Sequence, residues 1–300
     1  MTAGVADATA QAPAPGRIDT FTVGMPQLVG RERTVRVYLP PGYDAGDARY
    51  PVLYLQDGQN LFTPGAYGDW QVDETLERLV AQGRMPGLVV VGIDNGGARR
   101  WDEYGPWTQP AMLDWVDASW SRAREGGEGD RYVAWLADGL KPAIDERYRT
   151  LPGAEHTGIG GSSMGGLIAL YAGIQRPDVF GRVMAMSPAV WFAEGGGPWL
   201  SHNRLVTSIH RWEPRADVRV WIDVGTDEHS RATDPDVVDD DGVRMTYPRA
   251  YVEGAQAVAQ ALRARGVPAD HINHLVEQGA VHHEAAWARR LEQAVLWLYP

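Results

Sequence analysis

Residues 157–170, with the sequence TGIGGSSMGGLIAL, constrain the fold of this chain more than any other segment. An apolar, strand-forming run leads into the segment, and a helical pattern of leucine and isoleucine leaves it. Between the two, Gly161 to Gly165 fits G-x-S-x-G centred on Ser163. Such a serine sits at a strained backbone position on a sharp turn, where flanking glycines let neighbouring chains approach. The pattern predicts an exposed Ser163 Oγ at a helix start, with the N–H of Met164 as one oxyanion donor.

A carboxylate and a histidine follow this serine in the order that nucleophilic catalysis needs. A serine hydroxyl requires a histidine to take its proton and a carboxylate to hold that imidazole in the right tautomer. Asp227 and Glu228 follow one predicted strand, and His282 and His283 follow the last. Spacing alone does not choose within either pair, so both alternatives stay open on these residues.

The chain as a whole predicts an α/β fold. Polar and apolar residues alternate over 18–23 and 34–39, which predicts two half-exposed antiparallel strands. Apolar or alternating runs predict the other strands. They cover 50–55, 88–93, a run that ends near 159, 179–186, 218–224 and 271–276. Helical periodicity predicts helices at 70–84, 132–148 with a break at Pro142, 251–265 and 285–298. Alternating strands and helices predict a mostly parallel central sheet with helices on both faces.

The chain is expected to form one domain over residues 18–300, after a disordered Ala/Pro-rich tail over residues 1–17. An aromatic-rich stretch around 98–130 lacks strand periodicity and predicts a loop insertion that covers the site. Its rings are expected to line an apolar substrate pocket. They include Trp101, Tyr104, Trp107, Trp115 and Trp120.

The loop after the predicted strand 50–55 supplies a second set of candidates. Open α/β sheets place their ligands at the carboxyl ends of their strands. A backbone N–H of Gly58 or Gln59 is therefore the candidate for the second oxyanion donor. Gln56 and Asp57 in the same loop are predicted to bind substrate, and so is Trp191, which follows another strand end.

Composition excludes several classes of function. The net charge of −11 argues against a nucleic-acid partner and against anionic membrane surfaces. The chain has no cysteine, which removes disulfides and thiolate metal sites. No apolar run approaches the roughly 18 residues that span a bilayer, and no signal peptide is recognisable, so a cytoplasmic location is expected. No metal or organic cofactor is predicted; the expected partner is a small-molecule ester, and no sequence feature indicates an oligomeric state.

Several longer motifs together resemble the "putative esterase" family of α/β-hydrolases, which includes enterochelin esterases, feruloyl esterases and S-formylglutathione hydrolases. The resemblance extends from about residue 20 to the C-terminus. The motifs are YLQDGQNLF (54–62), WQVDE from Trp70, GIDNGGARRWDEYGPW (92–107), GGSSMGG (160–166), SPAVWF (187–192), DVGTDE (223–228) and VHHEAAW (281–287).

This resemblance implies a fold, an activity and a triad. The family places its acid at the last position of G-T-x-[DE], which is Glu228, and its histidine five residues before a tryptophan, Trp287, which is His282. With Ser163, these residues imply a serine carboxylic-ester hydrolase of the α/β-hydrolase fold that works through an acyl-enzyme. Aromatic, siderophore or sugar-linked esters are the implied substrates. An acyltransferase of the same fold and a non-catalytic binding module are the alternatives.

Overall fold

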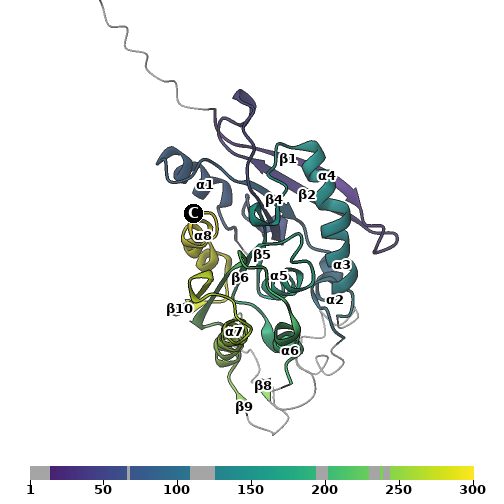
Figure 1. Ribbon diagram of the computed structural model, residues 1–300, viewed down its shortest axis with the longest axis vertical. Helices are drawn as coiled ribbons and strands as arrows, with labels where there is room; N and C mark the ends of the chain where they lie inside the picture. Colours follow the sequence, from purple (N-terminus) through teal and green to yellow (C-terminus); the bar gives the residue numbers. More distant parts are fainter. Residues whose placement is uncertain (1–13, 66–67, 109–125, 194–201, 230–236, 239–243) are drawn as a thin grey trace, which may run out of the picture.

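The computed structural model describes residues 14–65, 68–108, 126–193, 202–229, 237–238 and 244–300. Within them, one eight-stranded sheet has the order β1-β2-β4-β3-β5-β6-β7-β10 (Figure 1). β1 pairs antiparallel with β2, β2 pairs antiparallel with β4, and all later neighbours are parallel. The predicted parallel sheet with antiparallel N-terminal strands is therefore confirmed. The strands are β1 (Arg17–Gly24), β2 (Glu32–Leu39), β3 (Val52–Gln56), β4 (Val89–Ile93), β5 (Thr157–Ser162), β6 (Arg182–Met186), β7 (Arg219–Asp227) and β10 (Ile272–Val281), with a separate β8 (Val237–Val238) and β9 (Arg244–Met245) pair.

Helices cover both faces of the sheet. The helices α1 and α8 share one apolar cluster with one face, and α3 to α7 share the other cluster with the opposite face (Figure 1). The helices are α1 (Val72–Ala81), α2 (Arg100–Tyr104), α3 (Gly129–Trp135), α4 (Lys141–Arg147), α5 (Met164–Gln175), α6 (Arg204–Arg211), α7 (Tyr247–Ala264) and α8 (Glu284–Leu298).

The central strand β3 shows why the two clusters form. Successive side chains of a strand point to opposite faces, and every residue of β3 is buried. Leu53 and Leu55 pack with α1 and α8, whereas Val52 and Tyr54 pack with the helices of the other face. A near-continuous apolar run is what a strand buried on both faces requires.

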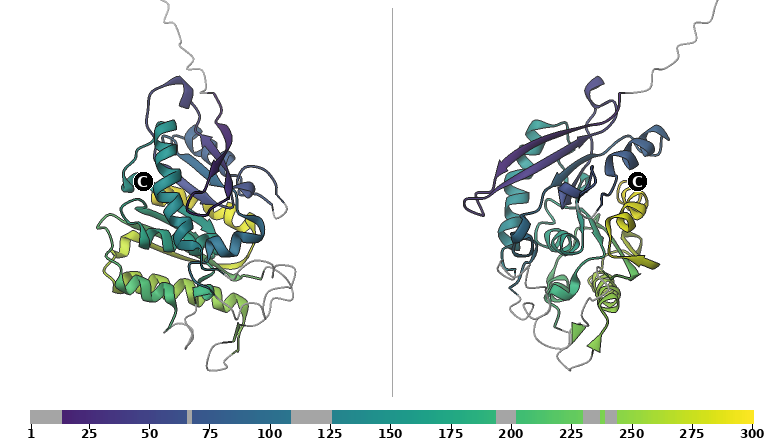
Figure 2. Two further views of the ribbon diagram at one scale, coloured as in Figure 1. Left: turned by 90° about the vertical axis from the view of Figure 1, so that its right-hand side faces the viewer. Right: turned by 180° about the vertical axis from the view of Figure 1, so that it is seen from behind.

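The β1–β2 ribbon lies along α3 and α4, as both views in Figure 2 show. The Trp135 indole N–H donates to the Gly24 carbonyl (3.1 Å), and the Tyr148 hydroxyl donates to Asp19 (3.0 Å). Arg17 already pairs with Leu39, so the sheet starts inside the range predicted as a tail. Most of that predicted tail, residues 1–13, lies outside the described residues.

The helix predicted over 132–148 is continuous but not uniform. A π-helical turn, Leu136–Leu140, joins α3 to α4 immediately before Pro142. Proline lacks an N–H, and its ring clashes with the carbonyl four residues earlier in an α-helix. The wider π turn relieves this clash, so the proline does not end the helix.

Two other sequence predictions need correction, and one helix is missing from them. The stretch predicted as a loop over 98–130 begins with a 3₁₀ turn (Gly97–Arg99) and α2 and ends with the start of α3, while 109–125, with Trp115 and Trp120, lies outside the described residues. The strand predicted over 179–186 starts only at Arg182, because the N–H groups of Val179 and Phe180 bond back to the Arg176 carbonyl in a turn. The helix α6 was not predicted.

Candidate active site

Four neighbouring parallel strands, β5, β6, β7 and β10, end at the same edge of the sheet. Ser163 follows β5, Ser187 follows β6, Glu228 follows β7, and His282 follows β10. Because the carboxyl ends of parallel strands meet at one edge, residues far apart in the sequence gather there.

Ser163 occupies the sharp strand-to-helix turn that its motif predicts. Its backbone angles are φ 56° and ψ −124°, a region that non-glycine residues seldom adopt. Its N–H donates to the Met186 carbonyl and its carbonyl accepts from the Ala189 N–H, both at 3.0 Å, and these bonds hold the turn. Ser163 is partly exposed, whereas Ser162 and Met164 are buried.

The two glycines of the motif are needed for space. A Cβ on Gly161 would lie 2.8 Å from the carbonyl carbon of Gly165, and a Cβ on Gly165 would lie 3.0 Å from the Cβ of Gln56. A larger residue at Gly161 would force β5 away from the start of α5, and one at Gly165 would force α5 away from the end of β3.

Glu228 is fully buried, and both of its carboxylate oxygens have polar partners. Its Oε1 accepts hydrogen bonds from the Ser187 hydroxyl (2.6 Å) and the Gly225 N–H (2.5 Å). Its Oε2 lies 2.7 Å from Nδ1 of His282. Burial raises the pKa of the Glu228 carboxyl, but the hydrogen bonds, first that from His282, outweigh burial and hold this pKa below its ordinary value.

The pairing with Glu228 determines what His282 can do. An ionised carboxylate is only an acceptor, so Nδ1 of His282 carries a proton and Nε2 of the neutral ring keeps a free lone pair. The imidazole lies between two aromatic rings, with centroid distances of 4.8 Å to Tyr251 and 5.0 Å to Trp287. The ring is thus oriented from three sides, as a general base must be.

The structure distinguishes Glu228 from Asp227 and His282 from His283, which spacing in the sequence did not. The Asp227 side chain is 59 % exposed, and its nearest basic partner is Nε2 of His229 at 3.8 Å. His283 is the N-cap of α8, where its Nδ1 accepts from the Ala285 N–H (3.2 Å). The carboxylate and imidazole that meet are therefore Glu228 and His282.

The capping role of His283 leads to a stability prediction. Replacing His283 with alanine removes the acceptor for the Ala285 N–H and is expected to lower the free energy of unfolding by about 1 kcal/mol. Ester turnover should stay within about twofold of wild type, whereas His282→Ala should lose at least about a thousandfold. Urea unfolding and initial rates measure the two effects. Asn at position 283 should restore the cap, and an equal loss of activity in both alanine variants would contradict the assignment.

The lowered pKa of Glu228 leads to a pH prediction. Its folded-state pKa lies below the unfolded value, so its stabilising contribution is present above the unfolded pKa and is lost as the pH falls through the folded pKa. The stability gap between wild type and Glu228→Gln should therefore narrow as the pH falls from about 5 to about 3 in urea unfolding. The exposed variant Asp227→Asn serves as the control. A gap for Glu228→Gln that stays constant over this range would contradict the account.

The predicted oxyanion donors lie at the start of two helical segments. Met164 is the first residue of α5 and Gly58 is the first residue of the 3₁₀ turn Gly58–Asn60. The first N–H groups of a helix have no acceptor within it. A Cβ on Gly58 would lie 2.6 Å from the backbone of Gly92 and Ile93, so this loop rests directly on β4.

Asp57 anchors this loop from a left-handed conformation (φ 57°, ψ 47°). Its carboxylate accepts two hydrogen bonds from Arg100, at 2.7 and 2.8 Å, and one from Asn95 at 2.7 Å. Its N–H donates to the Tyr104 hydroxyl (3.2 Å). The side chain of Gln59 accepts from the Asn95 N–H (3.0 Å), which ties the loops after β3 and β4 together.

The residues predicted to bind substrate differ in their exposure. Gln56 is buried, and its amide oxygen accepts from the Tyr132 hydroxyl (2.5 Å). Asp57, Tyr104 and Trp191 are also buried, and Trp101 and Trp107 are half-buried. The ring of Trp101 lies 6.2 Å from that of Trp191, while Trp107 packs on Tyr171 at 5.4 Å.

Two residues of the site were not singled out from the sequence. Tyr251, in α7, packs on His282, and burial raises the pKa of its hydroxyl to about 12, although hydrogen bonding to Ser163 works against this rise. Tyr251 therefore connects the serine and the histidine. Ser187 donates to Glu228. Ser187 could have been found from its position directly after a strand end. Tyr251 lies in an ordinary helical pattern, which gives no such signal.

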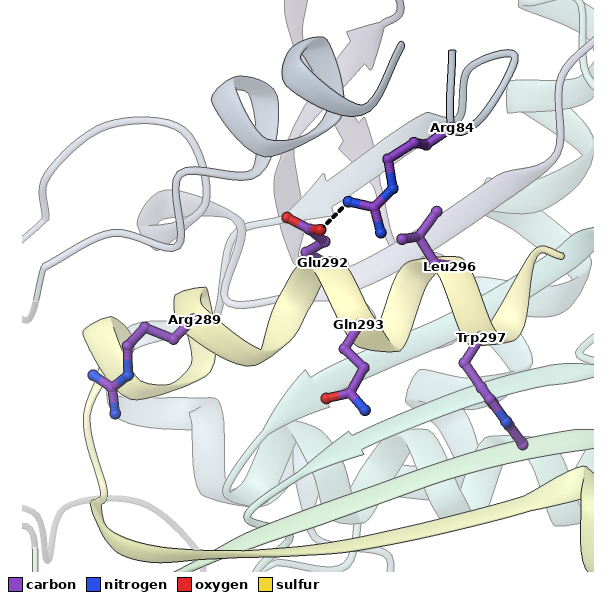
Figure 3. A pocket seen from close by; sticks show the side chains of 6 residues that line it. All are labelled: Arg84, Arg289, Glu292, Gln293, Leu296 and Trp297. Atoms are coloured by element: carbon purple, nitrogen blue, oxygen red, sulfur yellow. Dashed lines mark hydrogen bonds and ion pairs between the residues drawn. The ribbon is translucent and has the colours of Figure 1, made fainter. Parts of the chain in front are cut away.

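A separate hollow lies on the outer side of α8 (Figure 3). It is lined by Arg84, Arg289, Glu292, Gln293, Leu296 and Trp297. The carboxylate of Glu292 pairs there with Arg78 and Arg84. None of the residues predicted for catalysis lines it. Within the described part of the chain, no group of three or more histidine and acidic residues could hold a metal ion.

Comparison with known proteins gives the family. The chain matches the family described as "Putative esterase" over residues 27–298. It is 28 % identical over 268 residues to the uncharacterized protein YbbA of Bacillus subtilis, covering 89 % of this chain and 92 % of that one. It is also 28 % identical over 171 residues to the ferri-bacillibactin esterase BesA of Bacillus subtilis, covering 53 % and 54 % of the two chains.

Solved structures share the fold at low sequence identity. The enterobactin esterase FES from Shigella flexneri has a TM-score of 0.70 and 18 % identity, covering 99 % of this chain and 62 % of that one. A ferulic acid esterase has a TM-score of 0.64 and 20 % identity, covering 95 % and 98 %. The architecture is that of the α/β-hydrolases, and the family match supports a hydrolase of the carboxylesterase type. The chain belongs to the "Putative esterase" family. No helix among the described residues is long and apolar enough to cross a membrane.

Proposed function

We propose that this chain hydrolyses carboxylic esters through Ser163, His282 and Glu228. Ser163 Oγ attacks the acyl carbon while Nε2 of His282 takes its proton, and Glu228 orients the imidazole and stabilises the imidazolium. The N–H of Met164 and an N–H of Gly58 or Gln59 bind the oxyanion. His282 then returns the proton to the leaving alkoxide, an acyl-enzyme forms on Ser163, and a water activated by His282 releases the acid.

One observation carries this proposal. Both oxygens of the buried Glu228 carboxylate are engaged, and Oε2 is 2.7 Å from Nδ1 of His282. This pairing leaves Nε2 as the base at the edge of the sheet where the strained Ser163 turn begins α5. If His282 had a purely structural role, it would not need a nucleophilic serine held at that turn.

For the substrate, we propose an ester whose acyl group carries an aromatic ring. A continuous cluster of aromatic side chains extends from Tyr251, beside Ser163, to the half-buried Trp101. Neighbouring centroids in this cluster lie 5.1 to 6.4 Å apart. Its members are Trp101, Trp191, Phe192, Tyr247 and Tyr251. Its half-buried members, Trp101 and Tyr247, offer aromatic surface that suits a flat ring, and the names of the ferulic acid and enterobactin esterases fit this class.

A paired kinetic comparison tests the substrate class. Methyl ferulate and a catechol-carboxylate ester are compared with methyl butyrate, using wild type and Trp101→Leu. The aromatic esters should have a kcat/KM at least about tenfold higher, and Trp101→Leu should remove most of this preference while sparing butyrate. If wild type hydrolyses methyl butyrate faster than the aromatic esters, the aromatic substrate class is refuted and the triad assignment is unaffected.

A further inference from the structure

Ser187 lies behind the catalytic carboxylate, between β6 and the 3₁₀ turn Val190–Ala193. It is fully buried and has φ 42°, in the left-handed region that favours glycine. Its N–H donates to the Asp223 carbonyl of the neighbouring β7 (2.7 Å). The backbone thus holds a serine in an unfavourable conformation at a strand end, beside the site, which calls for a reason.

The hydrogen bonds of the Ser187 hydroxyl supply that reason. A serine oxygen accepts up to two hydrogen bonds and donates one. Ser187 Oγ accepts from the Trp287 indole N–H (3.0 Å) and from Nη2 of Arg290 (3.2 Å). Both partners are donors only, so the single hydroxyl proton must go elsewhere. Oε1 of Glu228, at 2.6 Å, receives it.

Arg290 fixes the far end of this arrangement. It is 4 % exposed and forms ion pairs with Asp223 (2.9 Å) and Glu277 (2.6 Å). Burial lowers the pKa of the Arg290 guanidinium, but Asp223, Glu277 and Glu228 together outweigh burial, and the net shift is upward. The guanidinium therefore stays charged, and it and Trp287 both belong to the rigid helix α8.

We propose that Ser187 is a positioning residue for catalysis: with both its lone pairs occupied by Trp287 and Arg290, its hydroxyl points its only proton at Glu228 and fixes the carboxylate against His282. The proposal rests on the proposed function, because Glu228 has to be the acid of the triad. Loss of the hydroxyl leaves Oε1 with only the Gly225 N–H, so the carboxylate can rotate away from the imidazole.

Removal of the hydroxyl changes two measurable quantities. A less restrained carboxylate lowers kcat and leaves KM unchanged, because Ser187 is buried away from the substrate. A carboxylate that turns away from the imidazole also stabilises the imidazolium less, so the acid limb of the kcat/KM profile moves to lower pH. The titratable groups that face His282 remain in place: Glu228 at the end of β7, Tyr251 from α7 and Glu284 from α8.

The test uses Ser187→Gly and Ser187→Ala in the full chain, with folding checked by thermal unfolding. Glycine adopts φ 42° without strain, so Ser187→Gly should fold even if Ser187→Ala does not. Thr157→Val is the matched control, since this buried hydroxyl bonds to the Gly153 carbonyl at the opposite end of β5. Ser163→Ala reports separately on the proposed function.

Ser187→Gly should lower kcat by about tenfold to a hundredfold with KM within about twofold of wild type. Its acid limb should shift to lower pH, and Thr157→Val should change neither quantity. If Ser187→Gly is folded and matches Thr157→Val in kcat and in pH profile, the positioning role is refuted while the triad stands. If Ser163→Ala remains fully active, the proposed function itself fails.

Discussion

Replacing Ser163 with alanine is expected to lower kcat for ester hydrolysis by at least about a thousandfold. The hydroxyl oxygen is the only heavy atom removed, and it is the atom that is proposed to carry the acyl group. The fold should persist, because the turn is held by backbone bonds to Met186 and Ala189. Initial rates with a nitrophenyl ester, together with thermal unfolding, measure both properties.

The neighbouring serine of the same motif is the matched control. Ser162 ends β5 and is buried, whereas Ser163 is partly exposed. Ser162→Ala should therefore retain activity within about tenfold of wild type. If the two alanine variants lose activity equally, the nucleophile assignment is wrong.

Glu228→Gln should have the second-largest effect, a loss in kcat of about 10³- to 10⁴-fold. The glutamine oxygen can still accept from Ser187 and Gly225, which places its NH₂ group opposite Nδ1 of His282. That NH₂ group donates, so Nδ1 must accept and the proton moves to Nε2. A histidine protonated at Nε2 cannot take the proton of Ser163.

Asp227→Asn is the control for this substitution. Its side chain is 59 % exposed, and the activity of this variant should stay within about twofold of wild type. The kcat values of both variants, measured at one pH near neutrality, decide between the two acids. A larger loss for Asp227→Asn would mean that the carboxylate found beside His282 is not the one used in catalysis.

Local sequence pattern predicted the architecture correctly wherever a strand is buried on both faces. β3 and β4 are nearly pure apolar runs, and the G-x-S-x-G turn has glycines that only a close strand–helix contact requires. Because ligands gather at the carboxyl ends of parallel strands, the order of the strands predicted that Ser163, the Asp227/Glu228 pair and the His282/His283 pair lie at one edge of the sheet.

The choice within the acidic and histidine pairs depended on information that the residues alone do not carry. β7 continues through Asp227, whose side chain is exposed, and the buried Glu228 follows directly. His283 caps α8, a role that histidine seldom fills, so N-cap preferences did not predict it. Only the resemblance to known motifs separated these neighbours before the fold was known.

Contacts between residues far apart in the sequence could not be predicted either, because local sequence patterns do not specify them. Ser187 and Arg290 are 103 residues apart, and no local pattern links them. Arg100 lies in a stretch predicted as a loop, although it forms part of α2 and holds Asp57. Such partners are set by tertiary packing, which overrides local preference.

Covalent trapping of the nucleophile tests the central claim most directly. The protein is treated with a fluorophosphonate ester, and the adduct is located by peptide mass spectrometry. We predict one adduct per chain on Ser163, no adduct in Ser163→Ala, and labelling at least about a hundredfold slower in His282→Ala. An adduct on another serine, or none in a preparation that turns over esters, would contradict the account.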